Sequence, residues 1–156
     1  MKELIQLTEV SNEDLPEIYC DLDEVLVDFM RGADAAVGGS FVKTDKDERW
    51  NAINQTKGFW ANLGWKPNAK RLHDFIIRYN PHVLSAYPDR DPNARNGKMK
   101  WLKKNTGFKR AKIHLVLRSQ KKDYATTDDK PNVLIDDYDK NIREWEAKGG
   151  IGILHT

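Results

Sequence analysis

The sequence predicts an α/β fold with a parallel sheet, and three observations support this class. Five short, mostly apolar runs have the character of strands, and they cover residues 17–20, 82–84, 113–117, 133–135 and 151–154. Most of them are too apolar to leave one face in water, which favours a sheet covered on both sides. Helical patterns lie between them, and this alternation is typical of parallel strands joined by right-handed crossovers.

Three helical segments are expected between the strands, in addition to the segment described next. The first has one apolar stripe with spacings of three and four residues, formed by Leu72, Phe75, Ile76 and Tyr79. The second covers residues 93–104. The third holds Ile142 and Trp145, and Gly149 is expected to end it.

The segment between the first two strands is unusually long. About sixty residues separate them, more than a crossover with one helix needs. We interpret residues 30–66 as a small helical cap, residues 17–29 and 67–156 as the core domain, and residues 1–16 as an N-terminal extension. A long surface loop is the alternative, but the aromatic side chains of this segment would be unusual on one.

The composition favours a soluble, globular, intracellular protein. Of 156 residues, 39% are hydrophobic and 32% are charged, and no apolar run approaches the length of a membrane span. The polar N-terminus has no apolar signal-peptide core, so we expect a cytoplasmic location and no membrane partner. A single cysteine, Cys20, excludes an internal disulfide and a multi-cysteine metal site.

Basic residues are concentrated in one part of the chain. The net charge is +2, but residues 98–122 contain ten lysines and arginines. Such a stretch attracts anions, including phosphates and nucleic acid. A solvated helix face explains the same pattern equally well.

Polar side chains follow four of the predicted strands. They are Asp21 and Asp23 after the first strand, Ser85 after the second, Lys121 and Lys122 after the third, and Asp136 and Asp137 after the fourth. Because ligands of open α/β sheets bind at the carboxyl ends of the strands, these groups are expected to converge on one site.

The residue types at this edge point to phosphate chemistry. Clustered carboxylates repel one another and need a cation, and all-oxygen ligands favour magnesium. An aspartate can attack phosphorus, and a second carboxylate can protonate the leaving oxygen. The alternative for Asp21 and Asp23 is an ordinary turn, and Asp136 and Asp137 could cap the next helix.

Residues 19–29, with the sequence YCDLDEVLVDF, resemble the first motif of the haloacid dehalogenase (HAD) superfamily. The closest similarity is to the 5'(3')-deoxyribonucleotidases and their bacterial and phage relatives. Leu84 and Ser85 are similar to the second motif, Lys121 to the third, and residues 134–137 to the fourth. Residues 58–63, 67–69 and 97–102 resemble the end of that family's cap and the helix after its second motif, so the resemblance covers residues 17–156.

The resemblance implies a Rossmann-like HAD fold, with a five-stranded parallel sheet flanked by helices, and it implies roles for the carboxylates. Asp21 would attack phosphorus and bind Mg²⁺. Asp23 would act as acid and base, with its backbone carbonyl on the metal. Asp136 would be the remaining protein ligand, and Asp137 would orient these groups without binding the ion.

The same resemblance implies how phosphate is held. Ser85 and the N–H of Ala86 would bind the phosphate oxygens, and Lys121 would neutralise the phospho-aspartate intermediate. Lys121 aligns with the third motif better than Lys122, which would then lie on the surface.

The implied substrate is a small phosphate monoester, and most closely a ribo- or deoxyribonucleoside monophosphate. Aromatic side chains could stack on its base, and the candidates are Phe29, Trp50, Phe59 and Trp60. The alternative for these four residues is a small core of the cap itself. Other small phosphate esters remain open, as does a nucleic-acid end phosphatase or binding module using residues 98–122, although nucleic acid is not an obligate partner. Relatives often pair, so a homodimer is possible.

Overall fold

The computed structural model describes residues 15–156, so the predicted N-terminal extension lies almost wholly outside the described residues. Five parallel strands form one sheet in the order β3-β2-β1-β6-β7. Their bounds are Ile18–Cys20 for β1, His82–Ala86 for β2, Ile113–Val116 for β3, Val133–Asp136 for β6 and Ile151–Leu154 for β7. The predicted fold class is confirmed.

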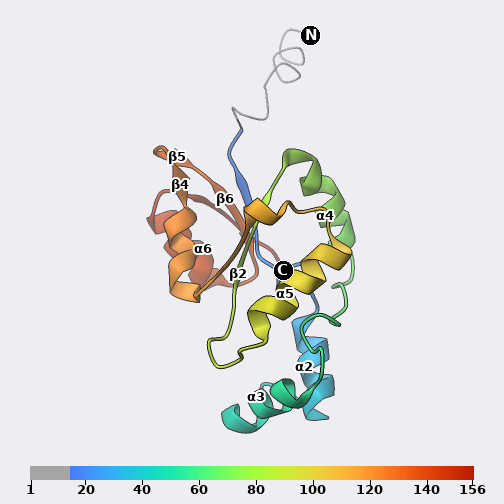
Figure 1. Cartoon of the computed structure of the whole chain (residues 1–156). Coiled ribbons are helices and arrows are strands. Elements are labelled where there is room, and N and C mark those ends of the chain that lie inside the picture. Colours follow the sequence, from blue (N-terminus) through green and yellow to red (C-terminus); the bar gives the residue numbers. More distant parts are fainter. Residues whose placement is uncertain (1–14) are drawn as a thin grey trace.

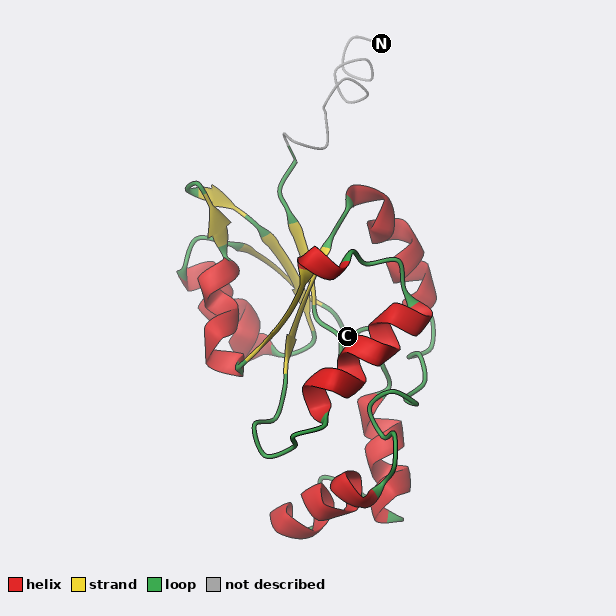
Figure 2. Cartoon of the chain, in the orientation of Figure 1, coloured by secondary structure: helices red, strands yellow, loops and turns green. Residues whose placement is uncertain are grey.

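Helices cover both faces of this sheet (Figures 1 and 2). Alternate residues of a strand point to opposite faces, so Cys20 faces one core and Tyr19 faces the other. The core around Cys20 includes residues of α4 (Ala69–Ile76) and α5 (Ala94–Asn105). The core around Tyr19 includes residues of α6 (Asp139–Ala147). Within residues 15–156, no helix combines the length and the apolar character that crossing a membrane requires.

The predicted apolar stripe on α4 is wrong at one position. Phe75 is 56% exposed, whereas His73 is buried beside Ala69 and Ile76 on the inner face of the helix. A polar ring can be buried there because His73 Nε2 accepts a hydrogen bond from the Gly107 N–H at 3.2 Å. The α-helix also ends at Ile76 and continues as a 3-10 turn, η2 (Ile77–Tyr79), which changes the phase of the pattern.

Two strands extend further than the sequence predicts. Ser85 and Ala86 pair with residues of β3, and Asp136 pairs with Leu154 of β7. Ser85 and Asp136 therefore belong to strands, not to the loops that follow them. A two-residue hairpin of β4 (Thr126–Thr127) and β5 (Lys130–Pro131) was not predicted, because such short strands show no periodicity.

The segment after β1 contains the two helices α2 (Phe29–Val37) and α3 (Lys46–Gln55), which lie apart from the sheet (Figure 1). Asp28 caps α2 by accepting a hydrogen bond from the Arg31 N–H, and Gly38 ends it with a left-handed conformation. Aromatic residues of this segment form a third apolar cluster, separate from the two cores of the sheet. We call residues 30–66 the cap segment; its status as a cap remains a prediction.

Two further 3-10 helices flank β3. One, η3 (Arg110–Lys112), leads into the strand. The other, η4 (Arg118–Tyr124), follows it and carries both candidate motif lysines. Because η4 turns back at the carboxyl end of the sheet, it brings a basic side chain to the acidic ends of β1 and β6.

Candidate active site

Asp21 follows β1 directly and is held by the sheet, since its N–H donates to the Ile135 carbonyl at 2.9 Å. The chain then makes a tight turn in which the Leu22 carbonyl accepts the N–H groups of Leu26 and Val27, both at 2.9 Å. Asp23 lies within this turn. The turn therefore fixes the direction in which the chain leaves the strand and keeps Asp23 close to the carboxyl end of the sheet.

Lys121 links the carboxylates of two neighbouring strands. Its Nζ lies 2.9 Å from Asp21 Oδ1 and 2.9 Å from Asp136 Oδ2, and the residue is 3% exposed. Burial opposes the charge on Lys121, but Asp21 and Asp136 outweigh it and raise its pKa. Lys122 is partly exposed, so the lysine among the carboxylates is Lys121.

Three carboxylates lie close together at this edge. Asp21, Asp136 and Asp137 each offer an oxygen, and these atoms lie within 4.8 Å of one another. Burial and the charge of Asp21 raise the pKa of Asp137 to about 8, and the same two causes raise that of Asp136. The crowding of like charges favours a cation, and the all-oxygen donors fit magnesium. Asp137 thus lies among the possible ligands.

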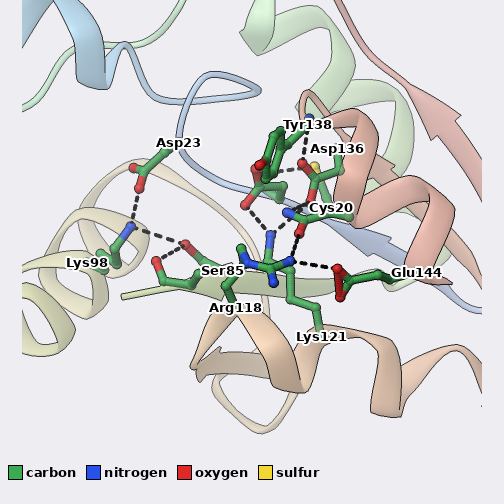
Figure 3. A network of polar contacts seen from close by, with 12 residues as sticks. Cys20, Asp23, Ser85, Lys98, Arg118, Lys121, Asp136, Tyr138 and Glu144 are labelled. Atoms are coloured by element: carbon green, nitrogen blue, oxygen red, sulfur yellow. Dashed lines mark hydrogen bonds and ion pairs between the residues drawn. The ribbon is translucent and has the colours of Figure 1, made fainter. Parts of the chain in front are cut away.

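Asp136 is further fixed by its own neighbours. Its Oδ1 accepts the Tyr138 N–H at 2.9 Å, and its Oδ2 accepts from Asn141 Nδ2 at 3.1 Å in addition to Lys121. Arg118 donates to Asn141 and to Glu144, so a chain of polar contacts runs from α6 to this carboxylate (Figure 3). Such supporting hydrogen bonds fix the orientation of a ligating carboxylate.

A second lysine connects the other two predicted site residues. Lys98 Nζ lies 2.6 Å from Asp23 Oδ2 and 3.1 Å from Ser85 Oγ (Figure 3). From the sequence alone, Lys98 is one charge of the basic stretch, and its contacts with Asp23 and Ser85 are not predicted. One signal could have indicated them, because Lys98 shares the inner face of α5 with Ala94 and Trp101, where a charged residue is unexpected.

A cavity of about 340 Å³ opens at these strand ends, and Asp21, Asp23, Ala86, Tyr87, Lys121 and Tyr138 are among its lining residues. Ser85 is fully buried, and its hydroxyl meets Lys98. Of the two residues predicted to bind phosphate here, Ser85 and Ala86, only Ala86 lines the cavity.

The four aromatic candidates pack together in the cluster of the cap segment. Phe29 stacks on Trp60 with ring centroids 5.4 Å apart, and Trp60 meets Phe59 edge to face at 5.1 Å. Phe59 and Trp60 are buried, while Phe29 and Trp50 keep part of their surface exposed. The aromatic residues that line the strand-end cavity are Tyr87 and Tyr138.

The protein is similar to several solved structures over most of its length. No protein-family model matches the chain, and no curated protein sequence matches it. A hydrolase from Streptococcus pneumoniae is similar with a TM-score of 0.53 and 12% identity, over 90% of this chain and 92% of that one. A hydrolase from Pseudomonas syringae is similar with a TM-score of 0.51 and 13% identity, over 88% of this chain and 82% of that one.

A third similar structure is an HAD family enzyme from Bacteroides thetaiotaomicron, solved in complex with magnesium and inorganic phosphate. Its TM-score is 0.50 at 15% identity, over 91% of this chain and 94% of that one. At such low identities the likeness concerns the architecture. The protein therefore has the fold of HAD-family enzymes.

Proposed function

We propose that the protein is a magnesium-dependent phosphatase that forms a phospho-aspartate on Asp21. The observation that carries the proposal is the Lys121 ammonium, which bridges Asp21 and Asp136 beside Asp137 at the carboxyl ends of parallel strands. A nucleophilic carboxylate and a fixed cation are the groups that phosphoryl transfer needs. The HAD-type fold supports the same reaction class by analogy.

In the first step, an Asp21 carboxylate oxygen attacks phosphorus and forms a new P–O bond. The bond between phosphorus and the leaving oxygen breaks, and Asp23 donates a proton to that oxygen. Lys121, whose pKa is raised, stays protonated and stabilises negative charge beside Asp21. The products of this step are the free alcohol and the phospho-aspartate.

In the second step, a water molecule attacks the phosphorus of the phospho-aspartate. Asp23 accepts a proton from this water, the bond between phosphorus and the Asp21 oxygen breaks, and inorganic phosphate leaves. Asp21, Asp136 and the backbone carbonyl of Asp23 would hold the magnesium ion, with Asp137 as a further oxygen donor within reach. When bound, magnesium supplies positive charge that offsets the charges of the carboxylates and the phosphate.

For the substrate we propose a nucleoside monophosphate, in line with the motif resemblance. Tyr87 and Tyr138 line the cavity, and of the four aromatic candidates Phe29 and Trp50 are the two with surface left to contact a base. The N–H of Ala86, a residue that lines the cavity, would bind the phosphate, and the buried Ser85 would reach it only if its hydroxyl turned from Lys98. A role as a nucleic-acid-binding module is less favoured, because Lys98, Arg118 and Lys121 of the basic stretch pair with acidic side chains of the protein.

The test is phosphate release from a panel of ribo- and deoxyribonucleoside 5'- and 3'-monophosphates, with magnesium and with a chelator. We expect magnesium-dependent release from a subset of the nucleotides. Release from a generic phosphate ester alone would retain Asp21 as nucleophile and reject the nucleotide substrate. Absence of release from every ester would reject the phosphatase and favour nucleic-acid binding, which a salt-dependent affinity would reveal.

Base stacking is tested by Phe29→Ala. Stacking of one base on one aromatic ring contributes about 1–3 kcal/mol, so kcat/KM for a nucleotide should fall about tenfold. Activity on a small artificial phosphate ester should change little. Equal losses on both substrates would argue against a base contact at Phe29.

A further inference from the structure

Lys98 is a charged side chain inside the protein. It is 1% exposed, although it comes from a helix whose other lysines are on the surface or partly so. Removing an ammonium from water costs several kcal/mol unless it is paired and hydrogen-bonded. The contacts of Lys98 therefore indicate why a lysine occupies this position.

The donors of Lys98 are all directed at the protein. An ammonium has three N–H groups. One side of Nζ faces Asp23 Oδ2 at 2.6 Å, another faces Ser85 Oγ at 3.1 Å, and the ring of Trp60 lies 4.8 Å away as a cation–π partner. This arrangement leaves no donor for a substrate in the cavity, so Lys98 acts through its partners.

Asp23 is held by only one of its two oxygens. Oδ2 pairs with Lys98, whereas Oδ1 is buried and has no hydrogen-bond partner. An unpartnered buried carboxylate oxygen is costly, which is typical of a group kept ready for chemistry. Because Lys98 holds Oδ2, it sets the orientation of the whole Asp23 carboxyl group.

The position of Lys98 is fixed in turn by the cap segment. A Cβ on Gly97 would lie 2.5 Å from Trp60 Cβ, so α5 and the cap segment approach as closely as a glycine allows. Trp60 is itself anchored, because its Nε1 donates to the buried Asp91 Oδ2 at 2.6 Å. Lys98 therefore lies where the cap segment meets the core.

We infer that Lys98 is a positioning residue for the acid and base Asp23: it holds Oδ2 and so orients the carboxyl group, and Trp60 keeps Lys98 in place. This inference rests on the proposed function, because it gives the phosphatase a residue that orients its proton donor. It assigns Lys98 no contact with the substrate phosphate.

The leaving group gives a readout that a structural role would not affect. An alkyl phosphate ester needs a proton on its leaving oxygen, whereas p-nitrophenolate leaves without one. Lys98→Met keeps the apolar stem and removes the charge, so the rate of alcohol release in a single turnover, which follows the first step alone, should fall about 10²-fold for a nucleoside or glycerol phosphate. The loss on p-nitrophenyl phosphate should be much smaller. Lys100→Met, at an exposed position of the same helix, is the matched control and should lose nothing.

Asp23→Asn should show the same split between the two esters, and the double variant should lose little more than Asp23→Asn alone, because the two residues act as one unit. Should Lys98→Met fail to fold, Lys98→Gln keeps one N–H for Asp23 and should show the same split in weaker form. Equal losses on both esters, or a rise in KM alone, would overturn the inference in favour of phosphate binding or simple structural support. A wild-type protein that hydrolyses neither ester would instead reject the proposed function itself, and this inference with it.

Discussion

The two ends of the parallel sheet both carry polar side chains, but they differ in the number of carboxylates that lie close together. At the carboxyl end, Asp21, Asp136 and Asp137 crowd together, and the ammonium of Lys121 pairs with the first two of them. This end has an excess of negative charge and opens into a cavity. A cation could bind to the carboxylate oxygens, and an anionic substrate could enter the cavity beside them.

At the amino end, the polar groups satisfy one another. His82 Nδ1 and His114 Nε2 share a hydrogen bond of 2.9 Å, and His82 Nε2 lies 3.1 Å from Glu17 Oε1. Tyr19 stacks on the His82 ring with centroids 4.1 Å apart. Burial lowers the pKa of both histidines, so the rings are neutral at pH 7.

The difference shows that polarity alone does not mark a site. Both ends hold ionisable side chains, but the network at the amino end has one carboxylate, Glu17, beside neutral rings, whereas the carboxyl end crowds three carboxylates together. Burial and then the charge of Asp21 raise the pKa of Asp137 to about 8, and such shifted carboxyls are typical of functional sites. We therefore expect substitutions at the carboxyl end to affect activity and those at the amino end to affect stability.

The largest expected effect is that of Asp21→Asn. The amide cannot attack phosphorus, so kcat should fall by at least about 10³-fold, while the circular dichroism spectrum stays that of the wild type and unfolding remains cooperative. Phosphate release in the presence of magnesium is the measurement. Normal turnover in this variant would remove the distinction between the two ends of the sheet.

Lys121→Met should have the next largest effect. It leaves Asp21 and Asp136 as buried carboxylates without their shared cation, and breaking a buried ion pair in this way costs about 3–5 kcal/mol. Urea unfolding in chelator measures the loss, and added magnesium should recover part of it. Lys122→Met is the matched control at the neighbouring, partly exposed position, and its free energy of unfolding should change by less than about 0.5 kcal/mol.

The smallest effect is expected at the amino end and depends on pH. The folded-state pKa values of His82 and His114 lie below 6.5, so the unfolded chain binds more protons and stability falls as the pH decreases from about 6.5. Asp137, whose folded-state pKa is raised, contributes with the opposite sign over the range below about 8.

A comparison of variants separates the two contributions. The urea midpoint at pH 5.5 minus that at pH 7.5 should be more positive in His82→Gln than in the wild type, because the variant lacks a histidine contribution that lowers stability at pH 5.5, whereas the Asp137 contribution is common to both proteins. An unchanged pH dependence in His82→Gln would show that the amino-end network does not respond to protons.

The sequence predicts the strand-end residues well because parallel topology forces them together. Asp21 and Asp136 lie close together because β1 and β6 are hydrogen-bonded neighbours, and this pairing does not depend on the conformation of the loops. Lys121 lies on η4, which follows β3 directly. The basic run after the predicted third strand therefore places a lysine at the same edge of the sheet. Topology thus carries the prediction of this half of the site.

The residues that the sequence does not place depend on helix phase and packing. Lys98 looks like a surface charge until α5 is docked, since its burial depends on which face of the helix meets Trp60. On α4, His73 is buried and Phe75 is exposed, although the apolar stripe predicts that Phe75 faces the core. The hydrogen bond from the Gly107 N–H allows the polar ring of His73 to be buried. Such details follow from tertiary contacts and not from local pattern.

Detection of the covalent intermediate tests the central claim most directly. The protein is mixed with magnesium and its best phosphate ester, quenched in acid within one turnover, digested with pepsin at low pH and analysed by mass spectrometry. We predict a phosphoryl group on the peptide that contains Asp21, and none on that peptide from Asp21→Asn. Turnover with an unmodified Asp21 peptide, or with the phosphoryl group on another residue, would contradict the account.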